Sequence, residues 1–191
     1  MNLLLDICPQ SVEIEGLQIP ISSDFRVSIL FEIAMQDREL SDMEKLQIVL
    51  DLYFPDTYIP DTKQAIEQAI WFYSCGKEEE KSESSGTGRQ KEIYSFEYDD
   101  EYIYSAFLEQ YGIDLNLEEL HWWKFKALFR GLKEDCLMSK IMGYRAMDVS
   151  SDMSKAEQKY YRKMKELYAL PDLRSQDEKE KEFAESLFGV L

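Results

Sequence analysis

Histidine is almost absent from this chain of 191 residues, in which His121 is the only one. A single histidine excludes most histidine-based metal sites and catalytic triads. No serine or cysteine nucleophile pattern accompanies it, so a structural role is the favoured interpretation. The chain also contains no GxxxxGKS, GxxxxGKT, GxGxxG or HExxH motif. We therefore expect a protein without enzymatic activity, metal or cofactor.

Cysteines and long apolar runs are scarce as well. Cys8, Cys75 and Cys136 are odd in number, widely spaced and without a CxxC pair, which indicates reduced thiols in a cytosolic protein. The start, MNLLLDICPQ, has no basic segment, and no stretch approaches ~20 uncharged apolar residues. We expect neither a signal peptide nor a transmembrane helix.

Positive charge is outnumbered, with 22 Lys and Arg against 38 Asp and Glu and a formal net charge of −16. Such a charge opposes binding to nucleic acid and to anionic membranes and favours a basic or apolar protein partner. The charge is also uneven. Residues 92–123 hold nine carboxylates and no Lys or Arg, whereas residues 124–145 hold six basic residues and two carboxylates.

What the chain has in abundance is aromatic residues, concentrated in Tyr94–Met147. We predict one helix there with Asp99 as its N-cap and Gly112 at its end, and a second from near Asn116 to Gly131. Each would be apolar around most of its circumference, so both must be enclosed by neighbours or by a partner. The adjacent carboxylates at the first helix start are explained by the helix dipole more simply than by acid–base catalysis.

Trp122 and Trp123 lie on the second of these helices. A pair of indoles could stack on bases, but the surrounding negative charge favours the core or a protein interface. The sequence leaves open whether they are buried in the protomer or contact a partner, although the narrow polar stripe of the helix favours burial.

The remaining pattern predicts a mainly α fold, a helical bundle with a small N-terminal β-hairpin. Residues 11–21 alternate apolar and polar side chains around Gly16, which is typical of a hairpin. Helix starts are indicated after Asp24, at a capping box of Ser41 and Glu44, after Asp61, and at a capping box of Ser154 and Glu157. Residues 77–91 contain no apolar side chain and are predicted to be a flexible linker. The expected division is therefore an N-terminal module over 1–76, the linker, and an aromatic-rich helical module over 92–191, whether or not the modules pack together.

The C-terminal segment FAESLFGVL supplies further candidate partner contacts at helical spacing, namely Phe183, Leu187 and Phe188. Together with Ala184 they make four apolar residues, which are too few to sustain an isolated helix. We expect them to dock on the protein's own core or, as the alternative, in a groove of a partner protein or of a second copy.

Several blocks of the chain resemble a bacteriophage tail-region protein family, found mainly in phages and prophages of low-GC Gram-positive bacteria. They are VEIEG, PISSDFR, WFYSCGK, YSFEYDDEYIYSAFLEQYGIDL, LHWWKFKALFRGL and IMGYRAMD, and LHWWKF is the most specific. The resemblance implies a gene just ahead of the tape-measure gene. It further implies a non-enzymatic tail-assembly chaperone in the cytoplasm of the bacterial host, which binds the tape-measure protein, the major tail protein or both.

Two other functions stay open on the sequence alone. One is a minor structural component of the tail, which purified virions would contain. The other is an acidic DNA mimic that inhibits a host protein, which the carboxylates of residues 92–119 suggest. Self-association as a homo-oligomer is also left open.

Overall fold

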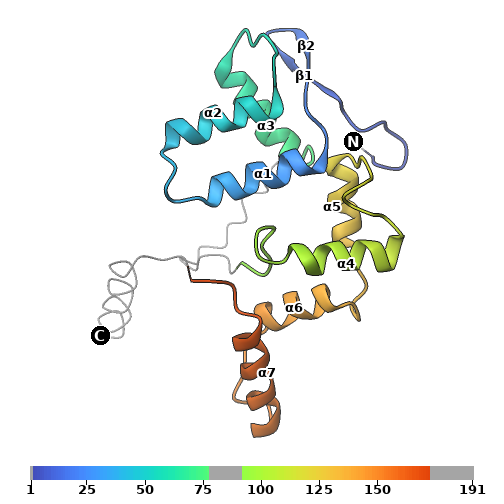
Figure 1. The fold of residues 1–191 in the computed structure, drawn as a ribbon, viewed down its shortest axis with the longest axis vertical. Coiled ribbons are helices and arrows are strands. Elements are labelled where there is room, and N and C mark those ends of the chain that lie inside the picture. The colour runs from blue at the N-terminus through green and yellow to red at the C-terminus, as the bar shows by residue number, and fades with distance from the viewer. Residues whose placement is uncertain (1, 78–91, 173–191) are drawn as a thin grey trace. The chain divides into compact units, whose positions relative to one another are not determined.

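The computed structural model describes residues 2–77 and 92–172. The chain forms two compact units, Met1–Ala146 and Met147–Leu191, hereafter unit 1 and unit 2. The first unit carries one antiparallel hairpin and six helices within these described ranges, and the second carries one described helix (Figure 1). The elements are β1 (Ser11–Ile14), β2 (Leu17–Pro20), α1 (Phe25–Gln36), α2 (Asp42–Tyr53), α3 (Thr62–Tyr73), α4 (Asp100–Tyr111), α5 (Trp122–Arg130), α6 (Leu137–Ala146) and α7 (Lys155–Leu167). The predicted fold, mainly α with a small N-terminal hairpin, is confirmed.

The hairpin turns through two residues, Glu15 and Gly16, whose φ angles of 51° and 75° are both positive. That geometry matches the twist of the flanking strands and explains the glycine. Val12, Ile14 and Ile19 are buried, and β1 packs against α3. The apolar residues of the alternating pattern therefore face inward, apart from Leu17, which is 52% exposed.

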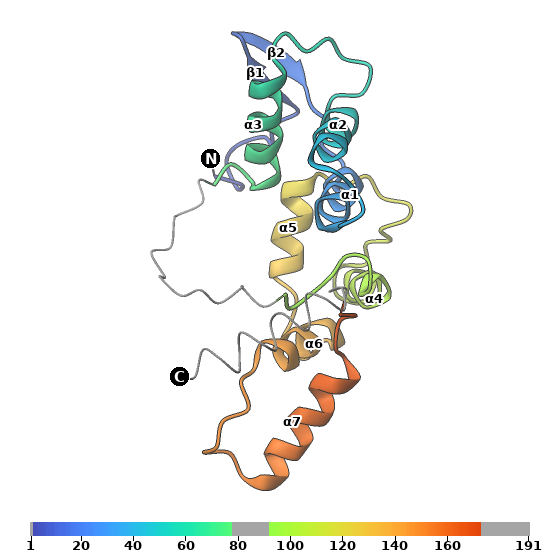
Figure 2. The ribbon, with the colours of Figure 1, turned by 90° about the vertical axis from the view of Figure 1, so that its left-hand side faces the viewer.

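The predicted caps of the first three helices are present. Asp24 Oδ1 accepts the Arg26 amide at 2.9 Å, and Asp61 Oδ1 accepts the Gln64 amide at 2.8 Å. Ser41 and Glu44 form the reciprocal capping box that begins α2. Helix α2 packs against both α1 and α3, so the three form a helical layer beneath the hairpin (Figure 2).

Helix α5 begins at Trp122, later than the predicted start near Asn116. The preceding residues are held by tertiary contacts instead of helical ones. The Arg26 guanidinium donates to the carbonyls of Leu115 and Glu118 at 2.5 and 3.1 Å, and the Trp122 amide donates to Ser23 O at 2.8 Å. Residues 117–120 therefore belong to a connection that lies against the N-terminal end of α1.

Asp99 occupies the N-cap position of α4 as predicted, but its side chain makes no capping hydrogen bond. The carboxylate is 1% exposed and pairs with Arg145 of α6, at 2.5 Å from Nη1 and 2.8 Å from Nη2. It also accepts the Ser95 amide at 2.9 Å. Asp99 thus joins α4 to α6 through a buried ion pair that local sequence could not reveal.

Unit 2, by itself, contains α7, which begins at the predicted capping box of Ser154 and Glu157. None of its residues is buried. Two predictions concern segments outside the described residues. They are the flexible linker, of which residues 78–91 are not described, and the docking of Phe183, Leu187 and Phe188. Both stay predictions.

Candidate functional site

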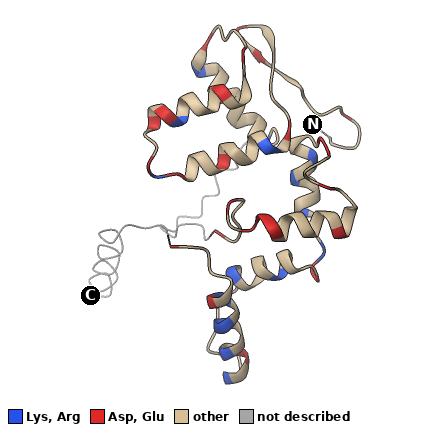
Figure 3. Cartoon of the chain, in the orientation of Figure 1, with Lys and Arg blue, Asp and Glu red and all other residues tan. Residues whose placement is uncertain are grey.

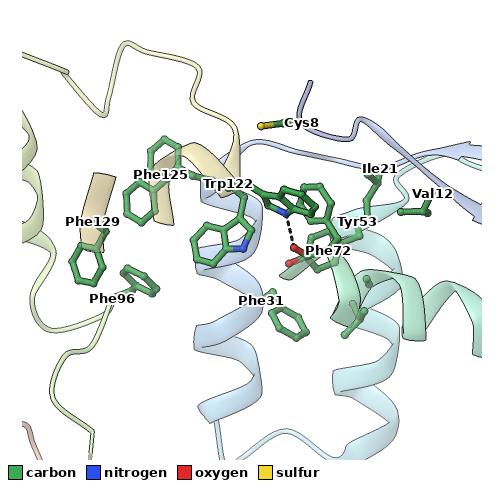
Figure 4. Close-up of a cluster of buried hydrophobic side chains, with 14 of the residues drawn as sticks. Cys8, Val12, Ile21, Phe31, Tyr53, Phe72, Phe96, Trp122, Phe125 and Phe129 are labelled. Carbon is green, nitrogen blue, oxygen red and sulfur yellow. Dashed lines mark hydrogen bonds between the residues drawn. The ribbon is translucent and has the colours of Figure 1, made fainter. Parts of the chain in front are cut away.

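The centre of unit 1 is an aromatic cluster built around α5. Trp122 and Phe125 are fully buried, and Trp123 is 4% exposed. The Phe125 ring stacks on Phe25 of α1 at 4.8 Å and on Phe107 of α4 at 4.9 Å between ring centroids. Figure 4 shows the rings of Phe125, Phe129 and Phe96 grouped on one side of Trp122, with Tyr53 and Phe72 on the other.

Both indole N–H groups donate to the end of α3. Trp122 Nε1 donates to Tyr73 O and Trp123 Nε1 to Phe72 O, each at 2.8 Å. Burying a tryptophan requires such a partner for its polar edge. Of the sequence-predicted candidates, these two indoles are therefore brought together in the core. Their contact with a partner stays a prediction.

A lysine lies at the edge of this cluster among three rings. Lys126 Nζ lies 4.9 Å from the ring centre of Trp122, 5.8 Å from that of Tyr73 and 5.9 Å from that of Tyr94. Burial lowers the pKa of Lys126, and Glu32 opposes that shift. Burial likewise raises the pKa of Glu32, whose carboxylate accepts the Tyr73 hydroxyl. The cation–π contacts and this hydrogen bond compensate for burying the two charges, which gives the group a structural role.

His121 is the N-cap of α5. Its Nδ1 accepts the Trp123 amide at 3.1 Å, and its Nε2 lies 2.9 Å from Pro9 O. Because Nδ1 accepts, the ring proton of the neutral form is on Nε2 and is donated to Pro9 O. Burial lowers the pKa of His121, which favours this neutral form. The structural interpretation of the single histidine fits this geometry.

A hollow of about 450 Å³, which we call the α1/α4 hollow, is lined by α1, α4, α5 and the chain before α4 and α5. Its buried lining is apolar, and its exposed lining is polar and acidic. The lining residues are Phe25, Arg26, Ile29, Phe96, Asp100, Glu101, Ile103, Tyr104, Leu115, Asn116 and Phe125.

The basic and the acidic residues that line the α1/α4 hollow differ in their surroundings. Arg26 is held by Asp24, with Nη1–Oδ2 at 2.9 Å, and by the Leu115 carbonyl. Asp100 and Glu101 are exposed in the first turn of α4, coloured red in Figure 3. The hollow therefore combines an apolar interior with an acidic rim. Its residues come from distant segments, and sequence reasoning missed it because only the tertiary fold assembles them.

Within residues 2–77 and 92–172, no group of three or more His, Cys, Asp or Glu side chains could hold a metal ion. Within the same ranges, no helix has both the length and the apolar composition to cross a lipid bilayer.

Fold and core define a mainly α protein organised by an aromatic helix. The model of the family described as Bacteriophage Gp15 protein matches residues 4–170. Because the match spans most of the chain, this protein belongs to that bacteriophage family. No curated protein and no solved structure matches it.

Proposed function

We propose that this protein is a non-enzymatic tail-assembly chaperone, which acts in the cytoplasm of the bacterial host and binds the tape-measure protein, the major tail protein or both. Membership of a bacteriophage family supports a role in phage morphogenesis. The resemblance to tail-region proteins of Gram-positive phages and prophages supports the finer assignment to tail assembly.

The observation that carries the proposal is the α1/α4 hollow. Phe25, Phe96 and Phe125 give it an aromatic interior, and exposed polar residues surround that interior. Interfaces of this kind bind by inserting an apolar side chain into a pocket bordered by polar groups. A chaperone needs such a surface to cover apolar segments of an unassembled client, and the net charge of −16 keeps the complex soluble.

The test is co-expression with fragments of the tape-measure protein encoded in the same tail module. Asn116→Trp places a large ring at the exposed edge of the hollow, and Gln47→Trp at an exposed position of α2 is the matched control. We expect the native chain and Gln47→Trp to keep a fragment in the soluble fraction, and Asn116→Trp to lose most of that effect.

Purified virions separate this proposal from its nearest alternative. A chaperone is absent from them or present only in trace amounts, whereas a minor tail component is present at a fixed number of copies. Fragments that remain equally insoluble with and without the native chain would contradict the chaperone assignment.

A further inference from the structure

A second hollow of unit 1 has the opposite charge. It measures about 200 Å³ and is lined by three basic residues, Lys77, Lys126 and Arg130, together with Leu3, Cys75, Trp123 and Ala127. No carboxylate of the described residues belongs to this lining. We call it the basic hollow. In a chain with a net charge of −16, a site lined by three cations calls for an explanation.

The basic hollow is built by one face of α5 and the turn that follows α3. Trp123, Lys126 and Arg130 are spaced at i, i+3 and i+7, so they share one helix face. The turn passes through Cys75 and Gly76, whose φ angles are 61° and 65°. A Cβ on Gly76 would lie 3.0 Å from the Trp123 ring, so the glycine allows the chain to lie against the indole and return Lys77 to the hollow.

The cations of the basic hollow keep hydrogen-bond donors to spare. Lys126 Nζ has one hydrogen bond, to the Tyr94 hydroxyl at 3.4 Å. Among the described residues, neither Lys77 nor Arg130 has a side-chain hydrogen bond or ion pair. All three lie close enough to Cys75 to oppose the rise that burial causes in the pKa of its thiol.

A purely structural explanation covers only part of this arrangement. Basic groups near the end of a helix stabilise its dipole, and the hollow lies at the end of α3. The last carbonyls of α3 are, however, already used. Phe72 O and Tyr73 O accept the indole N–H groups, and Trp71 O accepts the Gly76 amide at 2.9 Å. The guanidinium and ammonium groups are left with unused donors on the side of the hollow.

We propose that the basic hollow binds a carboxylate or phosphate group. Arg130 offers paired N–H donors to two oxygens of such an anion, and Lys77 and Lys126 add charge. Leu3 and Trp123 provide apolar contact for the carbon atoms that carry the anion. The same chemistry is available from free phosphate, from an acidic side chain of a partner, or from Glu78–Glu80, which follow Lys77 directly in the sequence.

Titration of the full chain with inorganic phosphate, at constant ionic strength with chloride as the reference anion, tests the proposal. We expect a saturable NMR shift of the Trp123 indole N–H. At phosphate ten times its dissociation constant, the unfolding temperature should rise by about 3–5 °C. Arg130→Gln should weaken binding at least about tenfold, since it removes a bidentate charged donor. Lys124→Gln, on the same helix but outside the hollow, is the control and should bind as the native chain does.

Two further arms identify the source of the anion. N-acetylglutamate amide replaces phosphate as a carboxylate probe, and a Glu78→Gln, Glu79→Gln, Glu80→Gln variant removes the neighbouring carboxylates. Binding of either probe to the native chain supports an external anion. Binding that occurs only in the triple variant supports the same site filled by the chain's own glutamates. If neither chain shows a saturable shift, or if Arg130→Gln and Lys124→Gln behave alike, the proposal is wrong. Because Asn116→Trp does not alter the basic hollow, this result is independent of the chaperone test.

Discussion

Helices α5 and α7 both carry adjacent aromatic residues, Trp122 and Trp123 in the first and Tyr160 and Tyr161 in the second, yet the two regions use them in opposite ways. In α5, Trp122, Trp123, Phe125 and Phe129 are all buried, and the helix is capped by a histidine that is bound to Pro9. In α7 no residue is buried, and Ser154 and Glu157 cap the helix from within its own first turn. Tertiary packing therefore specifies α5, whereas the cap of α7 is a local interaction.

The unfolding of unit 1 and of α7 can be followed by different probes. Trp71, Trp122 and Trp123 are the three tryptophans of the chain, and all belong to unit 1. Tryptophan fluorescence therefore reports the unfolding of unit 1, while amide hydrogen exchange of residues 155–167 reports α7.

The largest expected effect comes from removing a buried indole. Trp123→Ala should lower the free energy of unfolding of unit 1 by roughly 3–5 kcal/mol, because it leaves a cavity in the core and removes the hydrogen bond from the indole to Phe72 O. Denaturant unfolding followed by fluorescence measures this loss. Tyr160→Ala on α7, where the ring is 49% exposed, is the counterpart and should cost less than about 1 kcal/mol. A stable Trp123→Ala protein that no longer solubilises its client would instead assign the ring to an interface.

The second largest effect on stability is expected at the buried ion pair of unit 1. Asp99→Ala leaves the Arg145 guanidinium buried without its carboxylate, which costs about 3 kcal/mol or somewhat more. The double variant Asp99→Ala, Arg145→Met removes both charges and should recover part of that loss. A double variant that is as unstable as the single one would show that packing around the pair matters more than its charge.

The same contrast explains which features could be predicted from the sequence. Capping residues, the two-residue hairpin turn and the apolar faces depend on neighbours within a few positions, and the structure contains them. The start of α5 was predicted about one and a half turns too early, because Arg26 holds the chain before Trp122 against the N-terminal end of α1. The role of Asp99 was missed since its partner, Arg145, is 46 residues away.

The two hollows could likewise be predicted only as far as local spacing relates the residues that line them. The α1/α4 hollow takes its lining from several segments that no local pattern relates. The basic hollow left a partial signal, since the spacing of Trp123, Lys126 and Arg130 places them on one helix face. The contribution of Lys77 depends on the left-handed turn at Cys75 and Gly76. That turn could not be inferred from residue spacing.

A smaller effect is expected at the local cap of α7. Ser154→Ala removes the acceptor of the Glu157 amide and should destabilise the helix by about 1 kcal/mol. Hydrogen exchange of residues 155–167 should become about fivefold faster, while the fluorescence transition of unit 1 is unchanged. Ser154→Asp keeps an acceptor at the cap and serves as the control. A shift of the fluorescence transition in Ser154→Ala would mean that the cap of α7 is not only a local interaction.

The smallest effect concerns the cap of α5 and depends on pH. Burial lowers the pKa of His121 in the folded protein below its unfolded value of about 6.5. The unfolded chain therefore binds more protons between these two pKa values. The stabilisation from the neutral ring is fully present above pH ~6.5 and is lost as the pH falls toward the folded pKa. Protonation also places a proton on Nδ1, which can then no longer accept the Trp123 amide.

His121→Asn keeps a capping oxygen without a titrating group, so it should remove the part of the pH dependence that lies below pH ~6.5. Fluorescence-detected unfolding of both proteins from pH 8 to 5.5 measures this, and parallel curves for the two would refute the assignment of the neutral ring as the cap.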